Sequence, residues 1–157
     1  MIGYRSIGYG EFSFLVKTNN PVYGIRCWKG FDYTTCSADY GVVCFFQEPY
    51  YWHDKNHVID IQVDLKNPIL GAGTYMAAKS FGKTHIWTGR EGKTKYELPE
   101  AYVRCYWPKQ IIRIDLHNKY ANWFVREKVI PFCKKYRIEL LQDGKVVWNP
   151  AFGEKTA

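Results

Sequence analysis

Residues 58–65 constrain the fold more than any other part of this chain. Apolar side chains occupy every second position there: Ile59, Ile61, Val63 and Leu65. Polar side chains fill the positions between them: Asp60, Gln62 and Asp64. Because successive side chains of a strand point to opposite faces of a sheet, this alternation predicts a half-buried β-strand with one face on a hydrophobic core.

Weaker patterns predict the other elements. Further strands are expected at residues 2–7, 41–46, 101–107, 111–116, 137–141 and 145–148, and short helices at 11–17, 74–79 and 118–136. The continuous apolar run at 41–46 is typical of a strand that is covered on both faces. Pro131 is expected to kink or divide the last helix, and Asp143-Gly144 predicts a β-hairpin. The fold class is therefore α+β, with a split, mostly antiparallel β-sheet core and a few short helices.

The length of 157 residues suits one domain with its own core. We expect a single domain over 1–157, in which 1–116 form a core, 117–150 a C-terminal helix and hairpin, and 151–157 a frayed tail. The five cysteines are odd in number and form no CxxC pair, which favours reduced thiols in a cytoplasmic protein over disulfides or a zinc site. The chain contains no apolar run of membrane-spanning length, so no membrane association is expected.

The positive charge is confined to the second half of the chain. The 22 Lys and Arg residues exceed the 15 Asp and Glu residues by seven. Residues 1–80 contain seven residues of each sign, whereas residues 81–157 contain fifteen basic and eight acidic ones. A basic surface of this kind attracts phosphate-bearing partners.

Aromatic residues make up 18% of the chain. So many rings either fill a core or line a site that stacks flat ligands. Tyr50, Tyr51 and Trp52 form the densest group, in a predicted loop. They predict either a surface on which a ligand ring stacks or a loop whose side chains pack against the core.

Several standard motifs are missing. The chain has no phosphate-binding loop and no GxSxG sequence, and Gly71-Ala72-Gly73 lacks the third glycine of a dinucleotide fingerprint. His53 and His57 have metal-ligand spacing but lie in a predicted loop, so no metal site is expected.

The remaining features follow one another in a distinctive order. They are Tyr4-Arg5 in a first strand, Glu11 in a helix, the strands at 41–46 and 58–65, and Glu100 at the start of a late strand that leads to 111–116. This order resembles the ADP-ribosyltransferase superfamily. The resemblance covers residues 4–116. Within this range, the order of residues 45–46, 49–50 and 58–65 is similar to that of the DarT-like nucleic-acid-modifying branch of the superfamily. The Ser-Thr-Ser triplet and Glu-x-Glu motif of arginine-specific members are replaced here by Thr34-Thr35-Cys36-Ser37 and Glu97-x-x-Glu100, so the resemblance does not extend to arginine as acceptor.

The resemblance implies an NAD-dependent transferase. Glu100, or alternatively Glu97, would be the catalytic carboxylate that accepts a hydrogen bond from the ribose 2-hydroxyl as positive charge develops on the sugar. Arg5 would hold the diphosphate of NAD. The other expected NAD contacts are Tyr4, Phe45, Tyr50 and Tyr51.

The acceptor implied by the basic half is RNA or DNA, with protein as the alternative. Its expected contacts are Lys83, Arg90, Lys93 and Lys95. The small size and the resemblance suggest a bacterial or phage toxin or effector, for which an antitoxin or inhibitor protein would be a partner. Two other functions remain open: a basic nucleic-acid-binding module without catalysis, and a metal-independent ribonuclease that uses His85 or His117.

Overall fold

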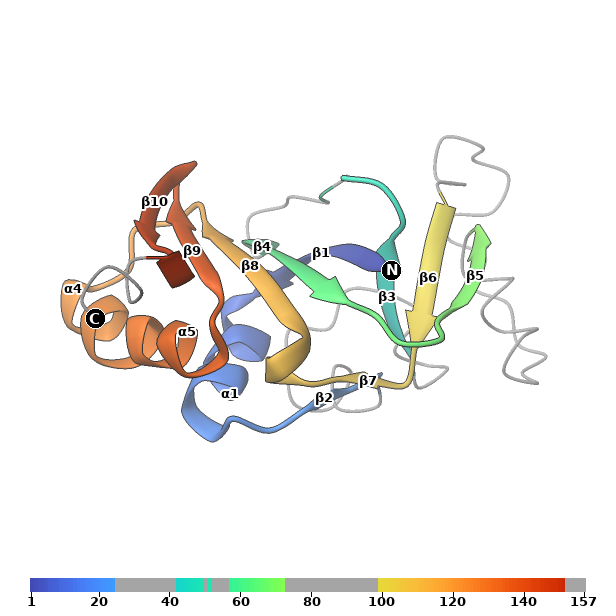
Figure 1. The fold of residues 1–157 in the computed structure, drawn as a ribbon, viewed down its shortest axis with the longest axis horizontal. Helices are drawn as coiled ribbons and strands as arrows, with labels where there is room; N and C mark the ends of the chain where they lie inside the picture. The colour runs from blue at the N-terminus through green and yellow to red at the C-terminus, as the bar shows by residue number, and fades with distance from the viewer. Residues whose placement is uncertain (25–41, 50, 52–56, 73–98, 152–157) are drawn as a thin grey trace.

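A computed structural model describes residues 1–24, 42–49, 51, 57–72 and 99–151, and every structural statement below concerns these residues. Eight strands form one sheet in the order β10-β9-β8-β4-β1-β3-β6-β5 (Figure 1). Their bounds are β1 (Ile2–Gly8), β3 (Val43–Phe46), β4 (His57–Asp64), β5 (Ile69–Ala72), β6 (Pro99–Val103), β8 (Ile111–Leu116), β9 (Glu139–Gln142) and β10 (Lys145–Trp148). A second sheet pairs β2 (Val22–Tyr23) with β7 (Cys105–Tyr106). Every pair is antiparallel except β8 with β9.

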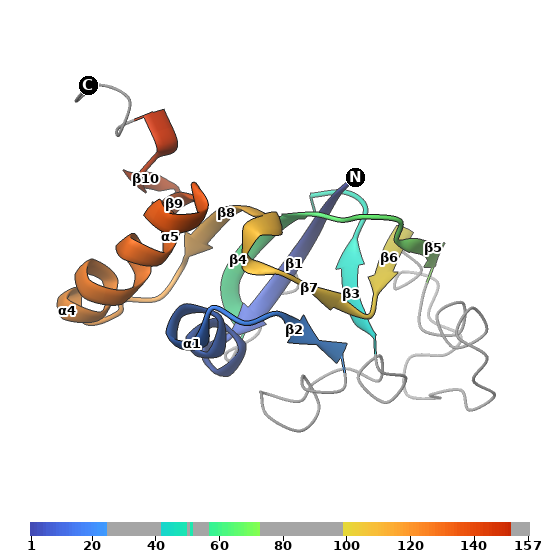
Figure 2. The same cartoon turned by 60° about the horizontal axis from the view of Figure 1, so that its bottom comes forward.

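Two helices cover one face of the large sheet. The first is α1 (Tyr9–Thr18). The second runs without a break through α4 (Asn122–Phe124), a π-helical segment η4 (Val125–Val129) and α5 (Ile130–Tyr136). α1 packs against β1 and β4, and α5 packs against β9; α1 also contacts η4 of the second helix (Figures 1 and 2). We call the sheet face beneath them the core face.

The core face bears the apolar positions of the alternating strands. Ile59, Ile61 and Val63 of β4 are fully buried, and so are Ile7 of β1 and Ile114 of β8. They form one cluster with helix residues that include Phe12, Leu15, Val129 and Phe132. The predicted half-buried strand at 58–65 is therefore confirmed.

The opposite face, which we call the polar face, bears the alternate residues of the same strands. These are Tyr4, Ser6, Cys44, Phe46, Asp60, Gln62, Glu100, Tyr102, Arg113 and Asp115, assigned by the register of the strand pairs. No helix among the described residues covers this face.

The α+β class, the mostly antiparallel sheet and the few short helices are as predicted. One expectation about burial is wrong. In β3, Val43 and Phe45 are buried but Cys44 and Phe46 are only half-buried, so the apolar run at 41–46 does not mark a strand covered on both faces. The sequence predicted a split sheet core. The observed division is between one sheet of eight hydrogen-bonded strands and the separate, two-stranded β2–β7 sheet.

The C-terminal elements follow the sequence pattern with one difference. The hairpin β9–β10 turns at Asp143 and Gly144, whose φ angles of 49° and 78° are those of a type I′ turn. Pro131 does not divide the helix. It lies in the first turn of α5, directly after the π-helical segment. A proline has no amide hydrogen to donate to the preceding turn, and the π-helical segment changes the hydrogen-bond pattern at this place, so the helix continues through Pro131.

The predicted helix at 74–79 lies outside the described residues. Among the residues that the structure describes, no helix has both the length and the apolar character needed to cross a membrane.

Candidate functional site

Glu100 is a buried carboxylate on the polar face. It is the second residue of β6, pairs with Phe46 of β3, and is 9% exposed. Its Oε2 atom accepts a hydrogen bond from the Cys44 thiol at 2.7 Å and another from the Tyr102 hydroxyl at 2.9 Å. Its backbone carbonyl accepts a third from the Gln47 side chain at 2.8 Å. The carboxylate is therefore held in one orientation by groups from two strands.

Glu100 lies in one row of side chains across the sheet. The strand register pairs Gln62 with Tyr4, Tyr4 with Phe46, and Phe46 with Glu100. Because neighbouring strands lie about 4.8 Å apart, Tyr4 is separated from Glu100 by about 10 Å. Among the predicted NAD contacts, Tyr4 thus shares a face with the predicted catalytic residue.

Tyr51 extends this aromatic surface. Its ring meets that of Tyr4 edge to face, with centroids 6.0 Å apart. Its hydroxyl accepts a hydrogen bond from Gln62 at 3.3 Å, and burial raises the pKa of the phenol. A cavity of about 240 Å³ opens beside the two rings, lined by Tyr4, Pro49, Tyr51, Asp60, Gln62, Arg113 and Asp115.

Arg5 does not join Glu100. It lies on the core face, where its Nε and Nη2 atoms donate to the two carboxylate oxygens of Glu11 at 3.1 and 2.7 Å. Its Nη1 atom donates to the carbonyl of Cys44 at 3.1 Å, and the Tyr106 hydroxyl donates to Glu11 at 2.6 Å. The guanidinium is thus part of a buried network that ties α1 to the sheet.

Phe45 also has a structural position. It is fully buried on the core face, and its ring meets Tyr106 at 5.5 Å and 85°. Arg5 and Phe45, both predicted NAD contacts, therefore lie on the face opposite to the one that bears Glu100. The physical reason is strand alternation, which turns odd-numbered residues of β1 and β3 away from the face that bears Tyr4 and Glu100.

Six of the predicted site residues lie outside the described residues: Tyr50, Lys83, Arg90, Lys93, Lys95 and Glu97. Their assignments stay predictions, as does that of His85.

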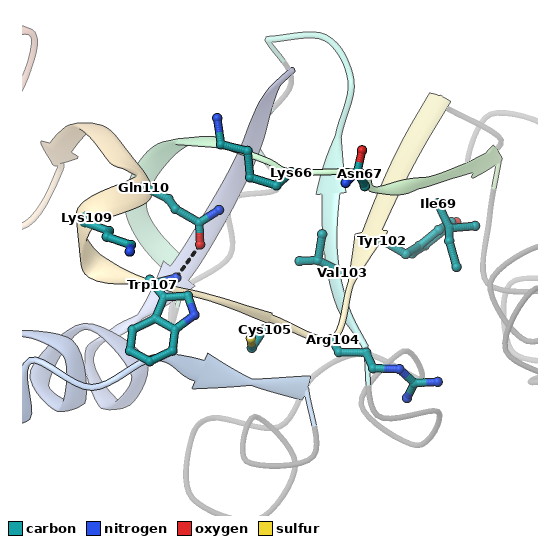
Figure 3. Close-up of a pocket in the computed structure, with 10 residues that line it drawn as sticks. All are labelled: Lys66, Asn67, Ile69, Tyr102, Val103, Arg104, Cys105, Trp107, Lys109 and Gln110. Atoms are coloured by element: carbon teal, nitrogen blue, oxygen red, sulfur yellow. Dashed lines mark hydrogen bonds between the residues drawn. The ribbon is translucent and has the colours of Figure 1, made fainter.

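A larger pocket, of about 570 Å³, opens at the end of the sheet where β6 leads through β7 to the 3-10 turn η3 (Pro108–Gln110) (Figure 3). Its lining residues are Lys66, Asn67, Ile69, Tyr102, Val103, Arg104, Cys105, Trp107, Lys109 and Gln110. Of these described lining residues, three are cationic and none is a carboxylate. Tyr102 links the pocket to the catalytic candidate, because it lines the pocket and also donates to Glu100.

Sequence reasoning did not single out this pocket. The only signal was local, a tryptophan and a lysine on either side of Pro108 in the basic half of the chain. The contributions of Lys66 and Tyr102 depend on the packing of separate strands.

His117 lies among carboxylates on the polar face. Its Nε2 atom is 2.7 Å from Asp60 and 3.8 Å from Asp115, and its Nδ1 atom is 3.9 Å from Asp143. Ser6 donates to the other oxygen of Asp60 at 2.9 Å. Three carboxylates around the ring repel a phosphodiester, so this setting disfavours His117 as a ribonuclease residue.

Cys133 is not a candidate nucleophile. Cys133 is buried in the core, and burial raises the pKa of its thiol to about 12, so it is a poor nucleophile. No group of three potential metal ligands occurs within the described part of the chain.

No family model, curated protein or solved structure matches this chain. The functional argument therefore depends on the geometry described above.

Proposed function

We propose that this chain is an NAD-dependent ADP-ribosyltransferase in which Glu100 is the catalytic carboxylate and nucleic acid is the preferred acceptor. The observation that carries the proposal is the Glu100 side chain, which is nearly buried and oriented by Cys44 and Tyr102. A carboxylate that is fixed before the ligand arrives loses little freedom when it binds.

The chemistry requires such a group. In ADP-ribosyl transfer the bond between nicotinamide and ribose C1′ breaks, and nicotinamide leaves with the bonding electron pair. Positive charge develops on the sugar, the acceptor forms the new bond to C1′, and the acceptor's proton passes to solvent. A carboxylate bound to the ribose 2-hydroxyl stabilises this transition state more than the ground state.

The polar face supports the rest of the NAD assignment only in part. Tyr4 and Tyr51 lie on the same face as Glu100 and offer aromatic surface for a nicotinamide or adenine ring. Arg5 has no role as a diphosphate ligand in this proposal, because its guanidinium is bound to Glu11. Three cations, Lys66, Arg104 and Lys109, line the pocket that Tyr102 also lines.

The test is Glu100→Gln, which keeps the size of the side chain and an oxygen that accepts hydrogen bonds. Glu127→Gln is the matched control, because Glu127 is exposed on the C-terminal helix. The measurements are nicotinamide release from labelled NAD and transfer of the label to RNA, DNA and protein. We expect Glu100→Gln to lower turnover by about 100-fold or more and Glu127→Gln to leave it unchanged.

Equal turnover by Glu100→Gln and the wild type would refute the site assignment. Absence of any NAD turnover in the wild type, with every acceptor, would refute the transferase itself.

A second candidate function is a nucleic-acid-binding module without catalysis. The observation that favours it is the pocket of Figure 3, whose cationic and aromatic lining needs no reaction to explain it. It predicts salt-sensitive binding with no nicotinamide release.

A toxin or effector role, with an inhibitor protein as partner, belongs to the same proposal. Expression of the wild type in bacteria should then arrest growth, whereas expression of Glu100→Gln should not. Equal growth of both cultures would count against this role.

A further inference from the structure

Trp107 is a large aromatic side chain at the surface of the pocket in Figure 3. It is 45% exposed although the core of the protein is dense in aromatic residues. Lys109 places its Nζ atom 5.9 Å from the centre of the indole ring. An exposed ring beside a cation is the combination that binds a nucleobase and its phosphate.

The backbone of Trp107 is fixed. Its amide donates to the side-chain oxygen of Gln110 at 2.8 Å, and its carbonyl accepts from the Gln110 amide at 2.9 Å. The other end of the Gln110 side chain donates to the carbonyl of Asp64, at the end of β4, at 2.9 Å. Gln110 therefore anchors Trp107 to the central sheet, so the ring is presented before any ligand binds.

The charges around the ring favour an anion. Lys66, Arg104 and Lys109 come from three segments and all three are exposed. Lys66 contacts the carboxylate of Asp64 at 2.9 Å, but this pair is at the surface and contributes little. None of the described residues that line the pocket is a carboxylate, so these residues do not repel a phosphate group.

We propose that this pocket binds single-stranded nucleic acid, with one unpaired base stacked on Trp107 and the flanking phosphates held by Lys109 and Lys66. A base within a duplex is already stacked on its neighbours and cannot offer its face to the indole, so duplexes should bind more weakly. The pocket volume of about 570 Å³ is within the range of nucleotide-sized sites.

The position of the pocket also names the acceptor class of the proposed transferase, and in this respect the inference rests on that function. Tyr102 lines the pocket and donates to Glu100 at 2.9 Å. The far end of the pocket from Trp107 is therefore in contact, through Tyr102, with the catalytic candidate. The binding itself does not depend on catalysis.

The experiment measures fluorescence anisotropy of labelled 12-nucleotide single-stranded DNA and RNA, and of a blunt DNA duplex, with the full chain. Trp107→Ala is compared with Trp123→Ala, since Trp123 is 53% exposed on the C-terminal helix. Lys109→Gln is compared with Lys135→Gln, because Lys135 lies 5.3 Å from the ring of Tyr136, outside the pocket.

We expect Trp107→Ala to weaken single-strand binding by about 5- to 100-fold and Lys109→Gln to reduce the salt dependence by about one phosphate contact. The Trp123 and Lys135 variants should match the wild type, and the duplex should bind more weakly than either single strand. Equal affinities for single-stranded DNA and RNA would indicate that only the base and the phosphates are recognised. Unequal affinities would indicate an additional contact with the sugar. Either result supports the proposal.

Three results would overturn it. They are no binding of either single strand, equal effects of the Trp107 and Trp123 substitutions, or a duplex affinity equal to that of the single strands. Glu100→Gln should retain single-strand binding. Single-strand binding by a wild type that turns over no NAD would refute the transferase and leave this site intact. NAD turnover by a wild type that binds no single strand would refute this site and leave the transferase intact.

Discussion

Arg5 shows how a residue suited to phosphate binding can have a structural role. Its side chain is 15% exposed and that of Glu11 is 5% exposed, with a closest contact of 2.7 Å between Nη2 and Oε1. Two charges this far from water are stable only as a hydrogen-bonded pair. The Tyr106 hydroxyl and the Cys44 carbonyl complete the pair.

Removing only the arginine should destabilise the protein strongly. We expect Arg5→Ala to lower the free energy of unfolding by about 3–5 kcal/mol, because it leaves the Glu11 carboxylate buried without its cation. The double variant Arg5→Met with Glu11→Leu should recover part of this loss. Urea unfolding at neutral pH measures both, and a change below about 1 kcal/mol for the single variant would contradict the structural role.

For Glu100, the sequence predicted the position of the side chain but not the contacts that orient it. Its place at a strand start could be predicted from the order of motifs, but its two donors could not. In the sequence, Cys44 is 56 residues from Glu100 and Tyr102 is two residues from it. Only the pairing of β3 with β6 brings Cys44 to the carboxylate.

At the scale of elements, the strand register decides which residues form a site. Tyr4 and Glu100 face the same side because Phe46 pairs with both of them. A shift of one residue in β1 would exchange Tyr4 for Arg5 on the polar face. The burial of Ile7 and Ile61 on the other face holds the observed register.

Gly3 is a second constraint on β1. A Cβ atom at this position would lie 2.6 Å from the Leu65 Cδ1 atom and 2.9 Å from the Phe45 Cβ atom. We therefore expect Gly3→Ala to lower the free energy of unfolding by about 1–3 kcal/mol through overpacking. Thermal unfolding should show a decrease of several degrees in the midpoint.

Gly144 provides the control for this prediction. An added Cβ atom there would meet no atom within 4 Å, and the cost of Gly144→Ala comes only from its φ angle of 78°. Because Leu65 is itself a core residue, Leu65→Ala is also expected to cost stability. If the clash with Leu65 is the cause, the loss in the double variant Gly3→Ala with Leu65→Ala should be smaller than the sum of the two single losses. Additive losses would contradict that explanation.

At the scale of the whole molecule, the C-terminal elements belong to the main core. Phe124, Val129 and Phe132 of the last helix pack in one cluster with Ile7 and Phe12 from the N-terminal region. β9 continues the large sheet by pairing in parallel with β8. The expected core at 1–116 is thus covered by the helix and hairpin that follow it.

Residues 1–116 should not fold without the rest of the chain. Truncation would expose Ile114 and Leu116 of β8, which are fully buried in the whole protein, and would leave β8 as an open edge. We expect the fragment to lack a cooperative unfolding transition and the full chain to show one. Circular dichroism during thermal unfolding measures this, and a cooperative transition in the fragment would show that the C-terminal elements are dispensable.

The sequence by itself determined the features that depend on near neighbours. The alternation at 58–65 predicted the buried side of that strand, since side-chain direction follows from strand geometry alone. At 111–116 the alternation is correct for Ile114 and Leu116 but wrong at the start of the strand, where Ile111 is buried and Ile112 is 41% exposed beside a register shift in the pairing with β4. Asp143-Gly144 predicted the hairpin, since a type I′ turn requires two residues with positive φ. The α+β class follows from such local signals taken together.

Only the tertiary structure decided what meets across the sheet. Strand pairing and register place Arg5 and Glu100 on opposite faces, and they bring Cys44 of β3 to the carboxylate oxygen that Tyr102 also contacts. They also determine the residues that share a pocket, such as Lys66 and Trp107. The physical reason is that these contacts depend on which strands pair and in what register, and pairing is settled by burial of the whole core rather than by the residues at the site.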